Sequence, residues 1–569
     1  MIDAIRHRGP DGDGFHLADG VGLGMCRLSI IDLAGGNQPL CDESGEVLVI
    51  QNGEIYNYLE LRQDLIAAGH HLGTVSDTEV IAHLYEEDPL EFPKRLNGMF
   101  AIAVFDRRRR RLTLVRDRLG KKPLFVYRDN EKVVFASEIK ALLAGGLVRP
   151  HVNTTGVHDF LSFNFVPLPE TMFQEVRHVP PGFMLLVEDQ VVSERRYWKL
   201  QIDRPEAWDD ARQAAFSDLL QDSVALRLRS DVPVGIFLSG GVDSSSIAWA
   251  TSHANRKPVR AFSIGFAGAE YDETGTAGLL SEALGIPLDV VEAAEELLRD
   301  LSAVMWHCDQ PHGDASFLPM LRLAQKAREH VKVVLTGEGA DELLGGYTWH
   351  ADGPYSSTRP WSSVRERFEA NAVFRHEEKV RLYAGELTGL ASRDSAALIR
   401  QVLDETAAAD PVNQTMLVDV AVLLPGNNLV KADRMGMAHG VELRSPFLDY
   451  RFVEFAFTIG GAVKIRDGFG KWPLRKAMEE RIPKATAWRA KQMFAVPMRE
   501  WLRDQGRPLL ETVINAPAAP LDRWFDRREL RRIVDEHVSG AADHTRKLRA
   551  IVALDLWCRR FAGAIGVPD

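Results

Sequence analysis

Between about residues 207 and 350, short apolar runs alternate with helical segments, and this alternation constrains the fold more than any other feature. The runs cover residues 232–238, 259–266, 288–292 and 331–336. Buried strands separated by helices are typical of a parallel sheet with helices on both faces. From about residue 354 onward the pattern is mostly helical. The sequence therefore predicts a doubly wound α/β domain with a helical C-terminal part.

The first run ends in a glycine-rich loop, Leu238-Ser239-Gly240-Gly241-Val242-Asp243-Ser244-Ser245, before a predicted helix over residues 246–254. The glycines let the backbone turn tightly, and the loop N–H groups and the helix N-terminus form an anion site. Ser239, Ser244 and Ser245 add hydroxyl donors. Asp243 would repel phosphate unless Mg²⁺ lay between them, so it is interpreted as a metal ligand. The Walker A spacing and its lysine are absent. The loop resembles that of ATP-pyrophosphatases, which cleave ATP between the α and β phosphates.

A second acidic loop, Thr336-Gly337-Glu338-Gly339-Ala340-Asp341-Glu342, follows another predicted strand. Parallel sheets bind ligands at the carboxyl ends of their strands. We therefore expect Asp341 to face Asp243 and complete the Mg²⁺ site, with Glu338 placed to touch an acyl-adenylate.

The first part of the chain, to about residue 200, is predicted to be β-rich. Short apolar runs cover residues 47–50, 100–105, 112–115, 133–136 and 183–187, which suits strands in stacked layers. Helices are expected over residues 58–68 and 78–86, with Asp77 as the N-cap of the second. Five consecutive arginines, residues 107–111, are expected at a solvated hairpin tip. A polar stretch after residues 195–200 predicts two domains, residues 1–200 and 201–569.

Composition limits the partners. The net charge of −11 does not indicate a nucleic-acid-binding surface. No apolar run of about 18 residues and no signal sequence are present, so we expect neither a membrane span nor export, and a cytoplasmic location. The four cysteines are scattered without a C-x-x-C pair, so we expect neither a zinc site nor a disulfide framework.

These motifs together resemble the class B, glutamine-hydrolysing asparagine synthetases and their relatives, including β-lactam synthetases, over nearly the whole chain. In the second domain the resemblance covers both loops above, Tyr271-Asp272-Glu273, the stretch 431–449 and Gly470-Lys471. It implies that Leu238, Ile264 and Gly337 contact ATP. It also places Lys471 over charge that develops on the α-phosphate and on an oxyanion, where a cation has a physical use.

In the first domain the resemblance implies an αββα sandwich of the N-terminal-nucleophile amidotransferase type. Its glutamine-binding elements match residues 8–12, 27–32, 52–57 and 76–77. Arg27 would pair with the glutamine α-carboxylate, and Asp77 and Glu54 with the α-ammonium. Asn52 and the Gly53 N–H would form an oxyanion hole.

The chain departs from this pattern at its start. The family's mature chain begins with a nucleophilic cysteine, whereas this sequence begins Met1-Ile2-Asp3, close to the element at residues 8–12. None of the four cysteines is expected to replace it, and Cys26 is expected to be packed in a strand beside Arg27. Two explanations stay open: the start codon is placed too late and a Cys-initiated segment is missing, or the chain is short and its glutaminase half is inactive.

The resemblance implies ATP- and Mg²⁺-dependent amidation of a carboxylate, such as aspartate, through an acyl-adenylate, with release of AMP and pyrophosphate. Glutamine or ammonia would supply the nitrogen, and a homodimer is compatible with the resemblance. Departures at residues 309–311, 491–497 and 288–291 bear on the acceptor. One alternative is therefore a tailoring ligase of the same family that acts on a specialised-metabolite carboxylate. A rival from another class is a non-catalytic binding homologue.

Overall fold

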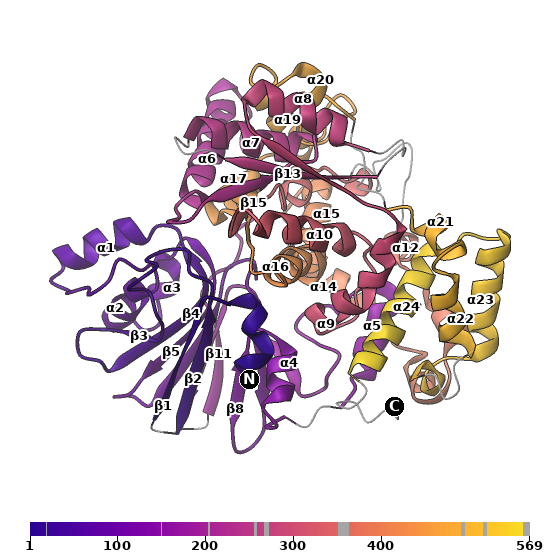
Figure 1. Cartoon of the computed structure of the whole chain (residues 1–569), viewed down its shortest axis with the longest axis horizontal. Coiled ribbons are helices and arrows are strands. Elements are labelled where there is room, and N and C mark those ends of the chain that lie inside the picture. The colour runs from indigo at the N-terminus through magenta and orange to yellow at the C-terminus, as the bar shows by residue number, and fades with distance from the viewer. Residues whose placement is uncertain are drawn as a thin grey trace.

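The computed structural model describes residues 1–18, 20–148, 151–189, 191–202, 205–254, 259–266, 272–350, 364–490, 496–515 and 520–561. Its two parts are distinct in Figure 1. The N-terminal strands lie at the lower left, and the later elements lie above them and to the right. The predicted division at residues 200 and 201 falls between strand β11 and helix α6, and its position stays a prediction.

The N-terminal domain contains a six-stranded antiparallel sheet in the order β11-β10-β6-β5-β4-β3. Its strands are β3 (Leu40–Cys41), β4 (Val47–Ile55), β5 (Gly98–Asp106), β6 (Arg111–Arg116), β10 (Phe183–Glu188) and β11 (Val191–Arg196). The same domain contains three helices, α1 (Tyr58–Ala67), α2 (Glu79–Glu87) and α3 (Phe92–Arg95). Leu65, Val80 and Leu84 from α1 and α2 are buried in one cluster with Val49 and Phe100 of the sheet, so these helices cover one sheet face.

A second β layer covers the other face. It is built from the hairpin β1 (Gly12–Ala18) and β2 (Val21–Arg27), and from β8-β7-β9, with β7 (Phe125–Arg128), β8 (Val133–Ala136) and β9 (Val176–His178). Leu23 of the hairpin packs in one core with Ala103 and Leu114 of the large sheet. Helix α4 (Ile139–Ala144) lies next to β8. The predicted αββα arrangement is confirmed.

The predicted strands of this domain all lie within observed strands, and the helix expected at residues 58–68 is α1. Arg107 to Arg110 form the exposed turn between β5 and β6, as predicted. The prediction that Asp77 caps α2 is wrong, because Thr78 is the N-cap residue and makes no side-chain cap. The Asp77 carboxylate instead accepts hydrogen bonds from the Ile55 backbone N–H and the Gln51 side chain.

The C-terminal domain is built on a five-stranded parallel sheet in the order β14-β13-β12-β15-β16. The strands are β12 (Val234–Phe237), β13 (Arg260–Gly265), β14 (Leu288–Glu292), β15 (Val333–Leu335) and β16 (Glu442–Arg444). Numbered in chain order, this is the 3-2-1-4-5 order of a doubly wound sheet, so the order reverses between β12 and β15. The two glycine-rich loops follow these two strands, and both therefore open onto the crevice where such sheets bind ligands.

Helices pack on both sides of this sheet and continue into a helical C-terminal part, as predicted (Figure 1). They are α6 (Asp210–Arg227), α7 (Val242–Ala254), α8 (Thr274–Leu284), α9 (Leu301–Cys308), α10 (Phe317–Arg328), α11 (Ala340–Leu344), α12 (Val364–Asn371), α13 (His376–Leu382), α14 (Ala397–Glu405), α15 (Pro411–Val418), α16 (Leu429–Met437), α17 (Tyr450–Phe457), α18 (Gly461–Lys464), α19 (Trp472–Met478), α20 (Lys484–Ala487), α21 (Met498–Arg503), α22 (Arg507–Asn515), α23 (Arg527–Ser539) and α24 (Thr545–Arg560). Helix α5 (Thr154–Phe163), from the N-terminal half of the chain, contacts α13. A π-helical stretch, Asp419–Asn428, leads directly into α16.

The two domains share one continuous apolar core. Phe125 and Phe160 from the N-terminal half are buried in the same cluster as Met435 and Trp557. Within the described ranges, no helix is long and apolar enough to cross a membrane. Cys26, Cys41, Cys308 and Cys558 are all free thiols.

Candidate active sites

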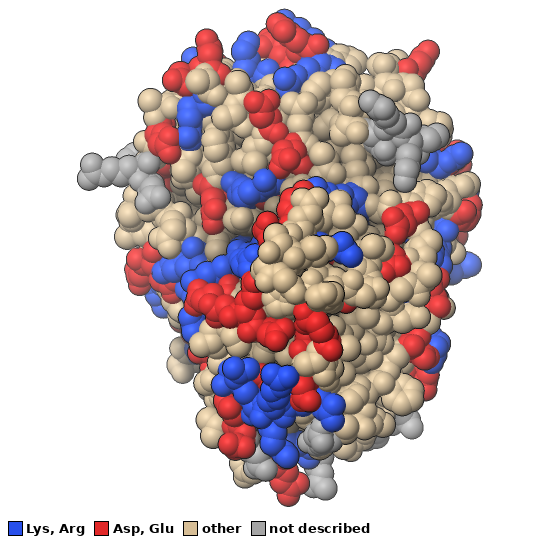
Figure 2. All heavy atoms as spheres, turned by 90° about the vertical axis from the view of Figure 1, so that its left-hand side faces the viewer, with Lys and Arg blue, Asp and Glu red and all other residues tan. Residues whose placement is uncertain are grey.

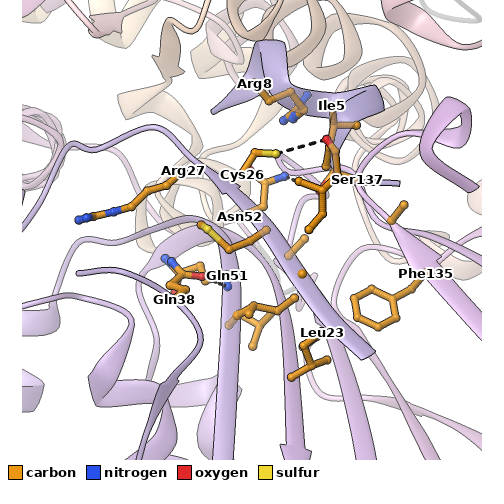
Figure 3. A pocket seen from close by; sticks show the side chains of 18 of the residues that line it. Ile5, Arg8, Leu23, Cys26, Arg27, Gln38, Gln51, Asn52, Phe135 and Ser137 are labelled. Atoms are coloured by element: carbon orange, nitrogen blue, oxygen red, sulfur yellow. Dashed lines mark hydrogen bonds between the residues drawn. The ribbon is translucent and has the colours of Figure 1, made fainter. Parts of the chain in front are cut away.

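The N-terminal domain holds a cavity of about 710 Å³ between its two β layers. Figure 3 shows Cys26, Arg27, Gln51 and Asn52 together in this cavity, with Leu23 and Phe135 farther along it. All five predicted glutamine-binding residues line it: Arg27, Asn52, Gly53, Glu54 and Asp77. The structure therefore brings these residues into one site.

Arg27 ends β2 and is held by the loop that follows. Its guanidinium donates to the backbone oxygens of Ile31 (3.1 Å) and Leu33 (3.2 Å) and to the side chain of Asn37 (2.9 Å). Burial lowers the pKa of Arg27, although an arginine stays charged at any physiological pH. These contacts fix the cation at the mouth of the cavity, which suits an incoming carboxylate.

Asn52 and Gly53 are consecutive residues in the middle of β4. The Asn52 amide donates to the Ser137 hydroxyl at 3.1 Å. Gly53 has φ +135, and a Cβ at this position would lie 1.9 Å from the Met99 carbonyl oxygen. Only glycine fits this backbone position, so the geometry around the predicted oxyanion hole depends on it.

Asp77 and Glu54 are buried carboxylates in the same cavity. Burial raises the pKa of Asp77 to about 6, against hydrogen bonds from Ile55 and Gln51 that act to lower it. Burial also raises the pKa of Glu54 well above its ordinary value, and the neighbouring Asp77 raises it further. One Glu54 oxygen pairs with Arg444 at 3.2 Å, and the other has no hydrogen-bond partner among the described residues. An ammonium group would satisfy both carboxylates.

Cys26 is the one cysteine whose side chain lines this cavity within the described part of the chain. Its thiol donates to the Ile2 carbonyl oxygen at 3.3 Å, and burial raises its pKa. A thiol held in this way is a weak nucleophile, because the reactive form is the thiolate.

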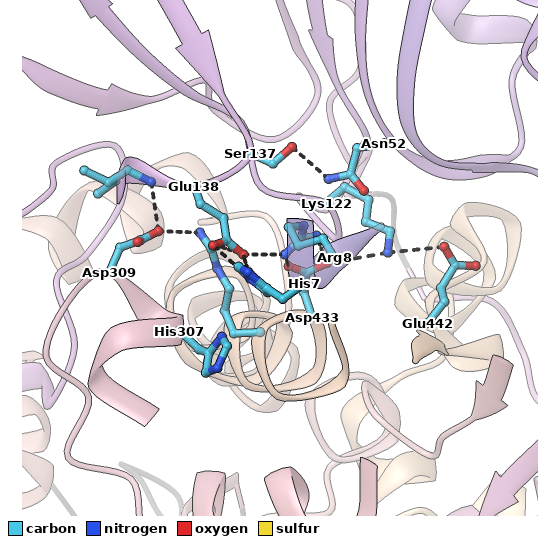
Figure 4. Close-up of polar contacts among 12 residues, drawn as sticks. His7, Arg8, Asn52, Lys122, Ser137, Glu138, His307, Asp309, Asp433 and Glu442 are labelled. Carbon is cyan, nitrogen blue, oxygen red and sulfur yellow. Dashed lines mark hydrogen bonds and ion pairs between the residues drawn. The ribbon is translucent and has the colours of Figure 1, made fainter. Parts of the chain in front are cut away.

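A buried network of charged residues joins the two domains (Figure 4). Arg8 pairs with Glu138 at 2.9 Å and with Asp433 of α16 at 2.8 Å. Arg434, also on α16, pairs with Glu138 at 2.8 Å and with Asp309 at 3.3 Å. Glu138 follows Ser137, the hydroxyl partner of Asn52, so the network begins at the cavity of the N-terminal domain. Losing one member would leave a buried charge unpaired, which typically costs about 3–5 kcal/mol.

A second cavity, of about 430 Å³, opens at the crevice between β12 and β15. Nine predicted residues line it: Leu238, Ser239, Asp243, Ser244, Ile264, Thr336, Gly337, Glu338 and Asp341. Gly240, Gly241, Ser245 and Lys471 were also predicted; they lie beside the cavity and do not line it. Apolar side chains, including Phe237, Phe262 and Phe266, line part of the same cavity.

The loop after β12 has the geometry expected of an anion site. Helix α7 begins at Val242, so its first N–H groups open onto the loop. The Ser239 backbone N–H donates to the Ser244 hydroxyl at 3.1 Å, which closes the turn. Gly240 has φ +74, and a Cβ there would lie 2.8 Å from Thr276. Glycine is therefore required for the tight packing of this loop against helix α8, which carries Thr276.

Lys471 lies between the two predicted metal carboxylates. Its Nζ is 2.5 Å from Asp243 Oδ2 and 2.6 Å from Asp341 Oδ1, and the lysine is 2% exposed. The other Asp243 oxygen is buried and makes no hydrogen bond to any described residue. Two adjacent carboxylates with such an oxygen provide the hard ligands that Mg²⁺ prefers, so the residues fit this ion.

Glu338 meets Lys431 of α16 at 3.1 Å in the same cavity. Beside them, Asn427 donates to Asp314 at 2.9 Å, and Asn428 donates to Glu342 at 2.5 Å. Burial and the nearby Asp341 raise the pKa of Glu342 to about 8.

The sequence did not predict Lys431, Asp314, Asn427 and Asn428 as site residues. The signal for Lys431 was present, because it begins the family-like stretch 431–449. The asparagines lie at the end of the π-helical stretch, which no simple periodicity identifies.

Two of the three departures linked to the acceptor, at residues 288–291 and 309–311, do not line the second cavity. The Gln310 side chain accepts a hydrogen bond from Met172 N–H at 2.9 Å, in the contact between domains, and does not line the second cavity. Residues 288–291 belong to β14 at the sheet edge. Of residues 491–497, those from 491 to 495 lie outside the described residues, as does Tyr271 of the family-like element at residues 271–273. Changes at 288–291 and 310 therefore give no direct reason for a different acceptor.

An αββα domain of the amidotransferase type joined to a doubly wound sheet with a pyrophosphatase-type loop defines an amidotransferase coupled to an ATP-using ligase. The family model for asparagine synthase matches residues 215–559, and that for a glutamine amidotransferase domain matches residues 1–198.

Curated relatives match nearly the whole chain. Asparagine synthetase [glutamine-hydrolyzing] 1 of Bacillus subtilis is 33% identical over 98% of this chain and 92% of its own length. A relative from Mycobacterium bovis is 35% identical over 99% of this chain and 94% of its own length. A Gibberella zeae protein named Amidase chry2 is 30% identical over 82% of this chain and 78% of its own length. The chain belongs to the glutamine-hydrolysing asparagine synthetase family and is a carbon–nitrogen ligase.

Proposed function

We propose that the protein converts aspartate to asparagine through an aspartyl-adenylate, with release of AMP and pyrophosphate and with nitrogen from glutamine or ammonia. The observation that carries the proposal is the position of Lys471 between Asp243 and Asp341, beside the glycine-rich loop and in reach of the second cavity. A cation at this point balances negative charge at the α-phosphate and on the carboxylate that attacks it.

ATP binding follows from the two kinds of lining in the second cavity. Leu238, Ile264 and Phe266 offer an apolar surface for a base, and the loop at the start of α7 offers N–H groups to phosphates. Mg²⁺ held by Asp243 and Asp341 would neutralise the pyrophosphate leaving group. Leu238 and Asp243 are near each other in the chain, so base and phosphates would lie along one crevice.

The acceptor carboxylate would lie at the polar part of the cavity. Lys431 and the amides of Asn427 and Asn428 present donors there, and Asp314 and Glu338 present acceptors. An amino acid carries both a carboxylate and an ammonium, so donors and acceptors together suit it. One carboxylate oxygen attacks the α-phosphorus and pyrophosphate leaves. Ammonia then attacks the acyl carbon, AMP leaves, and the excess proton of the attacking ammonia is lost.

Ammonia would form in the first cavity and move to the second. Glu54 in the first cavity pairs with Arg444 at the end of β16, and the Arg444 carbonyl accepts the Thr336 N–H beside the second cavity. Helix α16 makes a second link, since Asp433 and Arg434 join the network at the domain contact while Lys431 pairs with Glu338. The paired charges of both links are buried, apart from the half-buried pair Lys431–Glu338, which suits a fixed arrangement of the two cavities.

The test is aspartate-dependent ATP–pyrophosphate exchange. The proposal predicts exchange that needs MgCl₂ and aspartate but no nitrogen source. Titrating other carboxylates in the same assay decides the acceptor: a different carboxylate with a clearly higher kcat/KM would replace aspartate in the proposal. The absence of exchange with every carboxylate would refute adenylation itself.

A further inference from the structure

Four side chains from separate segments of the N-terminal domain meet at one point. Glu43 lies in the turn between β3 and β4, His70 follows α1, and His83 and Glu86 lie on α2. One ligand atom from each can be chosen so that all four lie within 4.8 Å of one another. These elements are at the left of Figure 1, on the side that Figure 2 turns to the viewer, where acidic and basic side chains are interspersed.

Among the four side chains, His83 is the one whose environment most needs an additional partner. Its side chain is fully buried, and neither ring nitrogen makes a hydrogen bond of acceptable geometry to any described residue. Its Nδ1 nevertheless lies 3.0 Å from Glu43 Oε2, so it points into the group. A buried imidazole without hydrogen bonds is costly unless something else satisfies its nitrogens.

The two imidazoles have the same arrangement. His70 Nδ1 faces the group, 3.2 Å from Glu43 Oε1, while its Nε2 lies 3.7 Å from Glu87. His83 Nε2 lies 3.9 Å from Glu79 on its outer side. Each ring therefore points one nitrogen inward and the other toward a carboxylate. Metal-binding histidines are commonly oriented in this way, because the outer carboxylate fixes the tautomer that leaves the inner nitrogen free.

We propose that Glu43, His70, His83 and Glu86 form a binding site for a divalent transition metal, with Zn²⁺ the best match. Two imidazole nitrogens and two carboxylate oxygens are a ligand set suited to tetrahedral Zn²⁺. Bonds of about 2.0–2.1 Å would place neighbouring ligand atoms about 3.4 Å apart, so the group must contract modestly. The Glu43 and Glu86 side chains are 34% and 41% exposed and are free to make this adjustment.

The metal would connect the β3–β4 turn, the segment after α1, and α2. These elements carry glutamine-site residues at their other ends: Gln51 to Glu54 on β4, and Asp77 just before α2. The proposed metal would therefore be structural and would hold the walls of the first cavity in fixed positions. The cysteine pattern predicted no zinc site, but histidine and glutamate ligands do not depend on cysteines.

The competing arrangement is a protonated His83 held between Glu43 and Glu79 without metal. Burial acts to lower the pKa of His83, but the carboxylates of Glu79, Glu43 and Asp42 outweigh it, so its pKa lies above the ordinary value. The groups that face this ring are Glu79 on α2 and Glu43 from the turn, and the ring of His70 packs edge-on against it at 5.1 Å between centroids. Metal and proton would compete for the same nitrogen, so Zn²⁺ affinity must fall as pH is lowered.

The experiment is calorimetric titration of the full chain, first stripped with a chelator, with ZnCl₂, and a parallel titration with CoCl₂ followed by visible absorption. The titrations are done in the Asp243→Asn background so that the carboxylate site between β12 and β15 contributes less. We expect one equivalent of Zn²⁺ and intense tetrahedral Co²⁺ bands. His70→Gln and Glu86→Gln should each lower the affinity by about 100-fold and remove those bands.

His71→Gln is the matched control, because His71 is the exposed neighbour of His70 and is not in the group. It should bind Zn²⁺ as the parent does. Zn²⁺, but not Mg²⁺, should raise the Tm of the parent and of His71→Gln, and leave the Tm of His70→Gln unchanged. Glu86→Gln provides the second test if His70→Gln fails to fold. Absence of Zn²⁺ binding to the parent, or equal binding by Glu86→Gln and His71→Gln, would overturn the proposal and leave the protonated His83 arrangement.

Discussion

Replacing Lys471 with methionine removes a charge and keeps almost the same length. Lys471 has φ +57, and methionine would carry the same Cβ in the same backbone conformation, so backbone strain is unchanged. The change leaves Asp243 and Asp341 without the ammonium that lies 2.5 and 2.6 Å from them. Breaking a buried charge pair typically costs about 3–5 kcal/mol. Because the two carboxylates are 18% and 17% exposed, we expect about 3 kcal/mol, at the lower end.

The effect on the reaction should be separate from this loss of stability. Loss of a group that stabilises developing charge costs about 100- to 1000-fold in rate, or about 2.7–4 kcal/mol. We therefore expect Lys471→Met to bind ATP while amide formation falls by about that factor. Urea unfolding with and without MgCl₂ measures stability, and a divalent cation should recover part of the loss. Lys476→Met on α19 is the matched control, since Lys476 is 49% exposed and pairs only with nearby Glu479 among the ion pairs described. Amide formation within threefold of wild type in Lys471→Met would refute the role given to this lysine.

Three further predictions concern the two cavities. Asp243→Asn and Asp341→Asn should each abolish ATP–pyrophosphate exchange while circular dichroism shows a folded protein, because each removes a carboxylate oxygen from the proposed Mg²⁺ site; wild-type exchange in either would remove that residue from the site. Glutamine binding, followed by calorimetry, should weaken as pH falls through about 6, because Asp77 is then protonated and no longer attracts the α-ammonium. Asp77→Asn should bind glutamine weakly at every pH. If this variant showed the same pH dependence of binding as the wild type, the assignment of Asp77 would be contradicted. Cys26→Ala should leave amide formation unchanged with either nitrogen source, because the raised pKa of the Cys26 thiol makes it a poor nucleophile; loss of glutamine-dependent turnover in Cys26→Ala would contradict this.

The secondary structure was largely predictable because its signals are local. Each apolar run falls on a strand, and the glycine-rich loops fall at the ends of β12 and β15. The helix cap at Asp77 was mispredicted for the opposite reason. An aspartate before a helix is a common cap, but here Gln51 and Ile55, more than 20 residues earlier in the chain, take its carboxylate.

The contacts between domains could not be predicted from local pattern. Arg8 and Asp433 are 425 residues apart, and nothing in either segment identifies the other. The group of Glu43, His70, His83 and Glu86 has the same property, because only His83 and Glu86 are near each other in sequence. Lys471 was assigned to the site through the family resemblance and Asp243 through its glycine-rich loop, but their direct contact was not predicted. The two carboxylates were expected to face each other across the pyrophosphate and to share Mg²⁺, and the structure adds the lysine between them.

The central claim is that the crevice between β12 and β15 activates a carboxylate as an acyl-adenylate. The most direct measurement uses aspartate labelled with ¹⁸O in its side-chain carboxylate, together with ATP, MgCl₂ and ammonium chloride, and reads the products by mass spectrometry. The mechanism predicts one ¹⁸O atom in AMP, because the attacking oxygen stays on the α-phosphorus when ammonia displaces it. Label in inorganic phosphate together with formation of ADP would show attack on the γ-phosphate and contradict the account.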